Sequence, residues 1–399
     1  RDRDVTGVQT CALPIWKVER REVQKMNIDL TEKQQSLKKN FSDFAKAELE
    51  PIAYEDDRYG KFPEGIIKKI AGKDFFGLTI PKEYGGCEGD FVSVAVLAEE
   101  FAKSNGAAAA ITMSHLVMAE QTILKYGNEE QKKKYLPDMV KGNKLGGYAY
   151  EEPGASLASG ENKVVAAKTG SSYALTGEKT IVANGGAADV YVVIAQTDEA
   201  EGLNGLSAFI VDAGDIGVVR KVGKLGLRSF PTAEIEFKGT KAQLLGKENE
   251  GINIVREIQA RVDIVCGAMG VGIGSTALKE SVEHSKTRIQ FGSPLSKLQA
   301  VQWMIAEMAE DLHVLNTLTY EAACCVDSKK DYLLDTAYLK MFGHKAVFEI
   351  GSNAIQVLGG TGYSRESSVE RYFRDLRGLF NYASINEYPQ KIIAGNLLK

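Results

Sequence analysis

The spacing of apolar residues changes twice along this 399-residue chain, and this constrains the fold more than any other feature. From Thr31 to about Lys144 apolar residues recur at helical intervals. From Gly146, short runs rich in β-branched and aromatic residues alternate with Gly, Asn, Asp and Thr, which is typical of strands and turns. Helical spacing returns at Gly251. The chain exceeds the size of a usual single core, so this order predicts separate domains.

We therefore expect an α+β multidomain protein. An N-terminal α-helical domain is predicted over residues 26–145, a small central β-barrel or sandwich domain over 146–247, and a C-terminal four-helix bundle over 248–399. Thr31 with Gln34 predicts a capping box at the first helix. A bundle seam is predicted where apolar residues recur every three or four positions, at Leu298, Val301, Ile305, Met308, Leu312 and Leu315.

Residues 1–25 do not read as part of this fold. Charges alternate at Arg1–Asp4, and Pro14 interrupts an apolar piece that is too short for a secretory signal. The acidic residues also argue against a mitochondrial transit peptide. We interpret this head as non-native or disordered, a fusion scar or mistranslated upstream sequence, with Met26 as the natural start.

Composition excludes several classes of function. The net charge of −4, with no basic stripe interleaved with aromatics, argues against nucleic-acid binding. No apolar run approaches the roughly 18 residues of a membrane span, so no membrane association is expected. Five cysteines without a Cys-x-x-Cys pair and four isolated histidines predict no metal site and a reducing, cytoplasmic location.

Three glycines in one segment, Gly270, Gly272 and Gly274, have the spacing of part of a dinucleotide-binding turn. No strand precedes them, and the flanking residues are helical. We expect them to permit close helix packing instead. The chain also contains no Gly-x-Ser-x-Gly elbow and no phosphate loop, which disfavours hydrolase and nucleotidase functions.

Three separated blocks carry the strongest functional signal, although each alone has the composition of a turn, loop or helix cap. They are Gly147–Ala155 with Thr176–Gly186, then Arg288–Gly292, and finally the stretch from Gln356 through Tyr372-Phe373-Arg374-Asp375 to Glu387. In this order and architecture, the chain resembles the acyl-CoA dehydrogenase family over essentially all of Met26–Lys399.

The resemblance implies a cofactor, a substrate and partners. In this family FAD lies between the subunits of a tetramer and accepts hydride from the β-carbon of an acyl-CoA, while a glutamate removes an α-proton. The α-proton of a thioester is only weakly acidic, so this step calls for a carboxylate in a dry pocket with a raised pKa. The electrons then pass to electron-transfer flavoprotein.

The residues that align with the family's catalytic base are alanines. Tyr382 takes the position of the tyrosine that precedes the glutamate, and Ala383 takes the position of the glutamate itself. Some branches place the base before an arginine in the first bundle helix, which here is Ala260 before Arg261. Neither methyl group accepts a proton, so no catalytic base is assigned. Arg261 and Tyr382 remain candidate substrate contacts.

The flavin contacts split into a changed set and a retained set. Tyr148 and Glu151 are candidate contacts of this chain's own pocket, where Glu151 replaces a threonine. Other ring-side positions are also changed, at Ser156, Leu157, Ile181, Ala183 and Ile385. The residues that serve the ADP end of a neighbouring subunit's flavin are all retained: Arg288, Gln290, Phe291, Gln356, Gly359, Gly360 and Gly362.

Two hypotheses follow. In the first, this chain is the degenerate subunit of a hetero-tetramer and completes the FAD site of an acyl-CoA dehydrogenase paralogue. In the second, it forms a homotetrameric FAD-dependent acyl-CoA oxidoreductase in which Tyr382, Glu151 or Glu387 handles protons. A weaker third alternative is an acyl-CoA-binding relic without redox activity.

Overall fold

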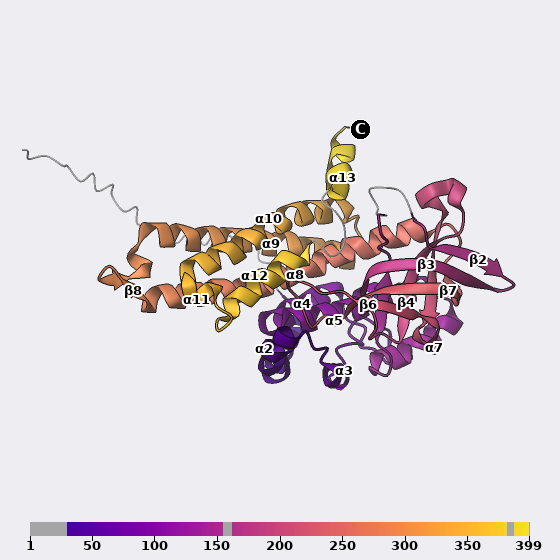
Figure 1. Ribbon diagram of the computed structural model, residues 1–399, viewed down its shortest axis with the longest axis horizontal. Helices are drawn as coiled ribbons and strands as arrows, with labels where there is room; N and C mark the ends of the chain where they lie inside the picture. Colours follow the sequence, from indigo (N-terminus) through magenta and orange to yellow (C-terminus); the bar gives the residue numbers. More distant parts are fainter. Residues whose placement is uncertain (1–29, 155–161, 381–386, 399) are drawn as a thin grey trace, which may run out of the picture.

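The computed structural model describes residues 30–154, 162–380 and 387–398, and it has three regions (Figure 1). An N-terminal group of helices and a seven-stranded β-domain lie against a long bundle of C-terminal helices. The predicted fold class is therefore confirmed. The head and the predicted site residues Ser156, Leu157, Tyr382, Ala383 and Ile385 lie outside the described residues.

The N-terminal region is entirely helical. Its elements are α1 (Glu32–Phe44), η1 (Ala45–Leu49), α2 (Glu50–Tyr59), α3 (Glu64–Ala71), η2 (Lys82–Tyr84), α4 (Phe91–Ser104), α5 (Gly106–Met113), η3 (Ser114–Glu120), α6 (Gln121–Tyr126) and α7 (Glu129–Val140). Thr31 accepts a hydrogen bond from the Gln34 backbone and donates its own backbone N–H to the Gln34 side chain, so the predicted capping box is confirmed. Nearly every residue of α4 and α5 is buried.

The middle region is a mixed β-sheet that closes on itself. Its elements are β1 (Gly146–Ala149), β2 (Val165–Thr169), β3 (Ser172–Ala183), β4 (Val190–Gln196), η4 (Glu199–Gly205), β5 (Leu206–Asp212), η5 (Ala213–Asp215), β6 (Gly217–Lys221) and β7 (Thr232–Leu245). The strand order is β1-β3-β2-β4-β5-β7-β6, with closing pairs β1–β4 and β3–β7. Exposure alternates along much of β7, as its alternating sequence predicts.

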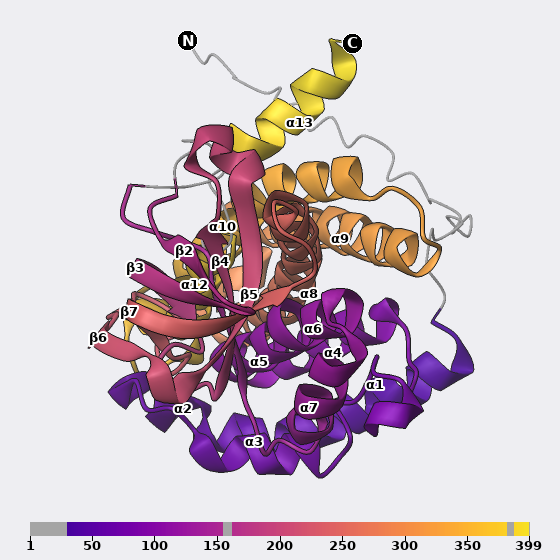
Figure 2. The same ribbon diagram turned by 90° about the vertical axis from the view of Figure 1, so that its right-hand side faces the viewer.

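The C-terminal region is built on a bundle of helices, of which the first three are long (Figures 1 and 2). Its elements are α8 (Gly251–Thr287), the hairpin of β8 (Ile289–Gln290) and β9 (Ser293–Pro294), η6 (Leu295–Lys297), α9 (Gln299–Asp327), α10 (Leu333–Leu358), α11 (Gly360–Tyr363), α12 (Ser368–Leu379) and α13 (Glu387–Leu397). Helices α8, α9, α10 and α12 form the bundle, while α13 projects from it. The predicted seam is largely buried, with Met308 and Leu315 fully enclosed.

Helix α8 is the shared core of the molecule. It packs against α4 of the N-terminal region and against α9, α10 and α12 of the bundle. Among the described residues, α8 is the one helix long and apolar enough to cross a membrane, and 78% of that apolar stretch is buried inside the protein. Its apolar character is therefore explained by its neighbours in the core.

The three glycines of α8 allow this close packing. A Cβ atom added at Gly272 would lie 2.3 Å from the Glu99 carbonyl oxygen of α4, closer than real contacts allow. A Cβ at Gly274 would lie 2.8 Å from a methyl group of Leu312. The expectation of close helix packing is thus confirmed, because these glycines lie inside a continuous helix and not in a turn.

Substitution at Gly272 provides a test of this contact. We expect Gly272→Ala to lower the free energy of unfolding by about 1–3 kcal/mol, since the new methyl group forces α4 and α8 apart. The matched control is Gly65→Ala in α3, where an added Cβ meets no atom within 4 Å. That control should be neutral or slightly stabilising, because alanine favours a helix more than glycine does. Chemical denaturation of both variants measures the difference, and equal stabilities would contradict the packing described here.

Candidate active site

Two buried lysine–carboxylate pairs lie close to Glu151, at the end of β1. Lys179 Nζ, fully buried on β3, is 2.5 Å from Glu152 Oε1 and 2.8 Å from the Tyr150 carbonyl oxygen. Lys340 Nζ on α10 is 3.2 Å from Asp263 Oδ1 on α8. Each charge is tolerated in the interior because its partner is buried with it. The pairs therefore connect the β-domain and the bundle to the same small polar region.

Glu151 itself is a carboxyl group in a poorly solvated setting. Burial raises its pKa to about 7, against the opposing attraction of Lys179 and Lys340, and the adjacent Glu152 raises it further. A carboxyl group with such a pKa exchanges protons readily near neutral pH, as general acid–base catalysis requires. Glu151 is thus the described residue of this region best suited to move a proton.

Arg261 is already engaged by its neighbours, whereas Ala260 offers no polar group. Arg261 Nη1 donates to Gln121 Oε1 at 2.8 Å, and Arg261 Nη2 is 2.9 Å from Glu257 Oε1. Burial acts to raise the pKa of Glu257, but hydrogen bonds from Lys125 and Tyr126 bring it below its ordinary value. Glu257 therefore remains ionised and paired, and it does not replace the base missing at Ala260.

A small apolar cavity of about 30 Å³ lies between α8 and the helices α5 and η3. The residues that line it are Ala110, Met113, Ser114, Met118, Leu227, Phe230, Val262, Val265, Cys266, Met269 and Leu379. Its volume is close to that of one methylene group. The described residues thus leave little room for a long hydrocarbon chain here.

One wall of this cavity is held by contacts from α12. Asp375 Oδ1 accepts a hydrogen bond from the Leu227 backbone N–H at 2.6 Å. Arg374 binds both carboxylate oxygens of Asp57, at 3.0 and 2.6 Å, and donates to the Leu225 carbonyl oxygen at 3.1 Å. These bonds link α12 to the N-terminal region and to the loop before β7. The position of Leu227 is therefore fixed by all three regions.

The changed ring-side positions of β3 have an unusual local geometry. Ile181 has a φ of 50°, which is rare for a β-branched residue, and its side chain is 46% exposed. It lies in an irregular stretch where the pairing with β7 shifts register between Lys179 and Val182. Ala183 is buried, and Tyr148 of β1, paired opposite it, is half-buried. The strand therefore presents an aliphatic side chain where the resemblance implies a tryptophan.

The positions that retain the expected ADP-binding residues lie at the end of the bundle where α8 ends and the β8–β9 hairpin begins. Arg288 follows α8 directly, and both its side chain and that of Gln290 are exposed. Phe291, at the tip of the hairpin with a φ of 52°, is 91% exposed. Such exposure of an aromatic ring is typical of a surface that meets another molecule. The hairpin thus presents a cation, an amide and a ring to whatever lies beyond it.

The glycine loop after α10 lies at the same end of the bundle, by α11 (Figure 1). Gln356, Gly359 and Gly360 are exposed. Gly359 has a φ of 57°, and a Cβ added at Gly359 or Gly360 would meet no atom within 4 Å. This open backbone lets a ligand approach closely, as a phosphate-bearing cofactor requires. These residues therefore fit the ADP half of FAD, whereas Glu151 is a poor match for an electron-rich reduced flavin ring.

One chain cannot bring these two half-sites together on a single cofactor. Arg256, which acts electrostatically on Tyr150 beside Glu151, and Arg288 are separated by thirty-two residues along α8, the 37-residue helix. At about 1.5 Å per residue this separation is roughly 48 Å, far longer than a dinucleotide. A single dinucleotide therefore cannot contact both the start of α8 and the hairpin at its end within one chain.

The sequence did not identify the buried pair of Asp263 and Lys340. A lone acid within the apolar stretch of α8 was a usable signal, but its partner lies 77 positions away in sequence. In the parts of the chain that the structure describes, no group of three His, Cys, Asp or Glu side chains is arranged to hold a metal ion.

Comparison with known families accounts for the whole described architecture. The chain matches the models of the acyl-CoA dehydrogenase N-terminal domain over residues 31–143, the middle domain over 147–240 and the C-terminal domain over 249–398. It is 37% identical to the acryloyl-CoA reductase (NADH) of Anaerotignum propionicum, covering 96% of this chain and 99% of that protein. It is 35% identical to CarC, a subunit of the caffeyl-CoA reductase–Etf complex of Acetobacterium woodii, with 92% and 99% covered.

Solved structures agree with this match. Butyryl-CoA dehydrogenase from Megasphaera elsdenii superposes with a TM-score of 0.90 at 32% identity, covering 94% of this chain and 100% of that one. PigA, solved with FAD and proline, superposes with a TM-score of 0.89 at 25% identity, covering 93% and 99%. The resemblance seen in the sequence is confirmed, and the expected cofactor FAD is confirmed at the level of the family.

The raised pKa of Glu151 makes stability depend on pH in a defined direction. Its pKa is about 7 in the folded chain against an ordinary 4.5, so the folded state binds the extra proton between these values. That stabilisation is complete below about pH 4.5 and is lost as pH rises through 7. Relative to the native protein, Glu151→Gln should gain up to about 2–3 kcal/mol in free energy of unfolding across this range.

Denaturation curves at several pH values measure this change. The matched control is Glu178→Gln on the exposed side of β3. A Glu151→Gln variant that follows the native pH dependence would show that Glu151 is solvated normally.

Proposed function

The chain belongs to the acyl-CoA dehydrogenase family of oxidoreductases acting on CH–CH groups, and we propose that it is a degenerate subunit that completes a partner's FAD site. The observation that carries the proposal is the contrast between its two half-sites. The exposed bundle end retains Arg288, Gln290 and the open loop at Gly359, while the ring-side pocket carries Glu151 and Ile181. A hetero-tetramer with a paralogue is the assembly that uses this chain as it stands.

In that assembly, FAD supplies the hydride acceptor, and this chain supplies groups that hold its phosphate end. Arg288 provides a fixed positive charge and a planar set of donors suited to phosphate oxygens. Gln290 adds an amide, and the loop at Gly359 and Gly360 lets backbone N–H groups approach. The partner chain provides the base and the ring contacts. The proposed role of this chain is therefore to bind and orient the phosphate end of the FAD.

Among the described residues, neither Ala260 nor Glu257 supplies the group that would remove the α-proton. Ala260 is apolar and buried, and Glu257 is committed to Arg261, Lys125 and Tyr126. Loss of a positioned base costs on the order of 10²- to 10⁴-fold in rate. A pocket without this step is relieved of selection for flavin contacts, which is consistent with the changes at Glu151 and Ile181.

A short acyl-CoA fits the assembly best, and electrons pass to an electron-transfer flavoprotein. The relatives named for acryloyl-CoA and butyryl-CoA point to this size class, and CarC belongs to a complex with an Etf.

Co-expression with an acyl-CoA dehydrogenase paralogue from the same genome tests the proposal. We expect a two-component tetramer with half the flavin of a homotetramer, because only the paralogue's pockets hold a ring. Arg288→Ala in this chain should then release flavin from the partner's pockets, as measured by absorbance per protein. The matched control is Glu151→Gln, which lies in the pocket proposed to be empty and should leave flavin content unchanged. A fully flavinated homotetramer of this chain alone would refute the proposal.

One observation favours a second candidate function. Glu151 has a pKa of about 7 and lies beside the ring-side positions, so it has the properties of a substitute acid–base group. In this alternative the chain forms a homotetramer that binds FAD by itself and acts on an acyl-CoA thioester. Glu151 takes the α-proton in its ionised form and returns it in the reverse direction.

The protein purified alone distinguishes this alternative. It should be yellow, and a short acyl-CoA should bleach it at a rate that rises with pH through about 7, as Glu151 ionises. Glu151→Gln should slow bleaching by about 10²- to 10⁴-fold, while Glu178→Gln should not. A colourless protein, or bleaching that survives Glu151→Gln, would eliminate this mechanism.

A further inference from the structure

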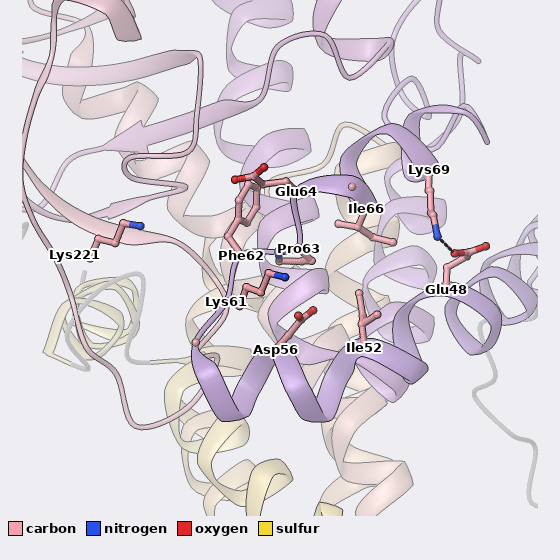
Figure 3. Close-up of a pocket in the computed structure, with 12 residues that line it drawn as sticks. Glu48, Ile52, Asp56, Lys61, Phe62, Pro63, Glu64, Ile66, Lys69 and Lys221 are labelled. Atoms are coloured by element: carbon pink, nitrogen blue, oxygen red, sulfur yellow. Dashed lines mark hydrogen bonds and ion pairs between the residues drawn. The ribbon is translucent and has the colours of Figure 1, made fainter.

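Two adjoining cavities lie between the N-terminal helices and the β-domain. The second borders Thr232, which pairs with the ring-side position Ala183, but none of the described ring-side residues lines either cavity. The first, of about 590 Å³, is bordered by α2, the chain before α3, and α3 (Figure 3). The second, of about 380 Å³, is bordered by the loops before β4 and β7. They share Gly60, Phe62, Glu64 and Lys221, so they form one groove. Each of the two cavities has a volume in the size range of small-molecule sites.

A buried carboxylate with an unsatisfied oxygen faces the first cavity. Asp56 is only 7% exposed, and among the described residues no donor reaches its Oδ2 atom. Figure 3 shows its side chain directed into the cavity, below Phe62 and Pro63. Burial raises its pKa, although Lys61 opposes this. Buried polar atoms without partners are rare in native structures, so this one calls for a ligand that carries a hydrogen-bonding group.

The charged residues that line the second cavity are mostly cations. Lys221, Lys224 and Arg228 line it, and Glu64 is the acid among its lining residues. Lys224 Nζ is 2.6 Å from the Phe230 carbonyl oxygen. Burial lowers the pKa of Lys224 to about 8 despite the attraction of Asp375. An anion here would stabilise the charged form of Lys224 and raise its pKa towards the ordinary value, so the cavity favours phosphate or a similar group.

An apolar surface joins the acidic end to the basic end. Phe62 lies on the border of both cavities and is half-buried, and Ile52, Pro63 and Ile66 continue the apolar surface in the first cavity. A planar ring packs well against such a surface. The groove therefore offers, in order, a hydrogen-bonding acid, an aromatic face and a cluster of cations.

We propose that this groove is a second ligand site that binds a nucleotide, separate from the flavin site. The phosphates lie among Lys221, Lys224 and Arg228, the base packs on Phe62, and an N–H group of the base bonds to Asp56. None of these residues belongs to the ring-side pocket or to the bundle end that starts at Arg288. The site thus goes beyond the proposed role in flavin binding and does not depend on it.

Titration of the full-length protein with ADP, followed by calorimetry, tests the site. Lys221→Ala combined with Arg228→Ala should weaken ADP at least tenfold and should equally weaken inorganic pyrophosphate. Asp56→Ala should weaken ADP but not pyrophosphate, because only the base contacts Asp56. The matched control Lys238→Ala removes an exposed lysine on β7, paired with Glu236 outside the groove, and should change neither affinity.

The other outcomes overturn the proposal. ADP binding that persists in these variants but disappears in Arg288→Ala belongs to the flavin site. A nucleotide site is also excluded if the protein does not bind ADP at millimolar concentration. It is excluded as well if the groove variants weaken only the binding of an acidic protein partner. Flavin content, measured on the same variants, reports the proposed subunit role independently, so failure of one hypothesis does not imply failure of the other.

Discussion

The close contact between α8 and α4 is the constraint on which the rest of the structure depends. Gly272 lets α8 lie against the α4 backbone, and the same helix forms one of the four members of the bundle. Because α8 is continuous over 37 residues, it holds the ring-side residues near its start far from the hairpin at its end. The same geometry underlies the proposal that each flavin site is shared between chains.

The polar region around Glu151 follows from how the two other regions meet α8. Lys179 pairs with Glu152 inside the β-domain, and Lys340 pairs with Asp263 inside the bundle. Each cation is close enough to act on Glu151, but burial outweighs this attraction and its pKa still rises to about 7. The unusual acidity is thus a property of the interface between regions and not of Glu151 alone.

Local features of the sequence predicted local features of the fold. The capping box at Thr31, the strands of the β-domain and the glycines of α8 depend on neighbouring residues or on one helix face, so spacing was sufficient. The ion pair of Asp263 with Lys340 and the commitment of Arg261 to Gln121 and Glu257 depend on contacts between distant segments. The predicted roles of Tyr382 and Ala383 remain predictions, because both lie outside the described residues.

Fold and chemistry are separable in this chain because different side chains support them. Removing a base at Ala260 leaves a small apolar residue in a well-packed helix, and Ile181 lies on an exposed, irregular turn of β3. Neither Ala260 nor Ile181 takes part in the two buried lysine–carboxylate pairs or in the ion pair of Arg374 with Asp57. Under the proposed function, a subunit of this kind would keep its stability without catalytic groups, provided that another chain needs the surface at its bundle end. Retention of Arg288 and the open glycine loop is the consequence expected of that need.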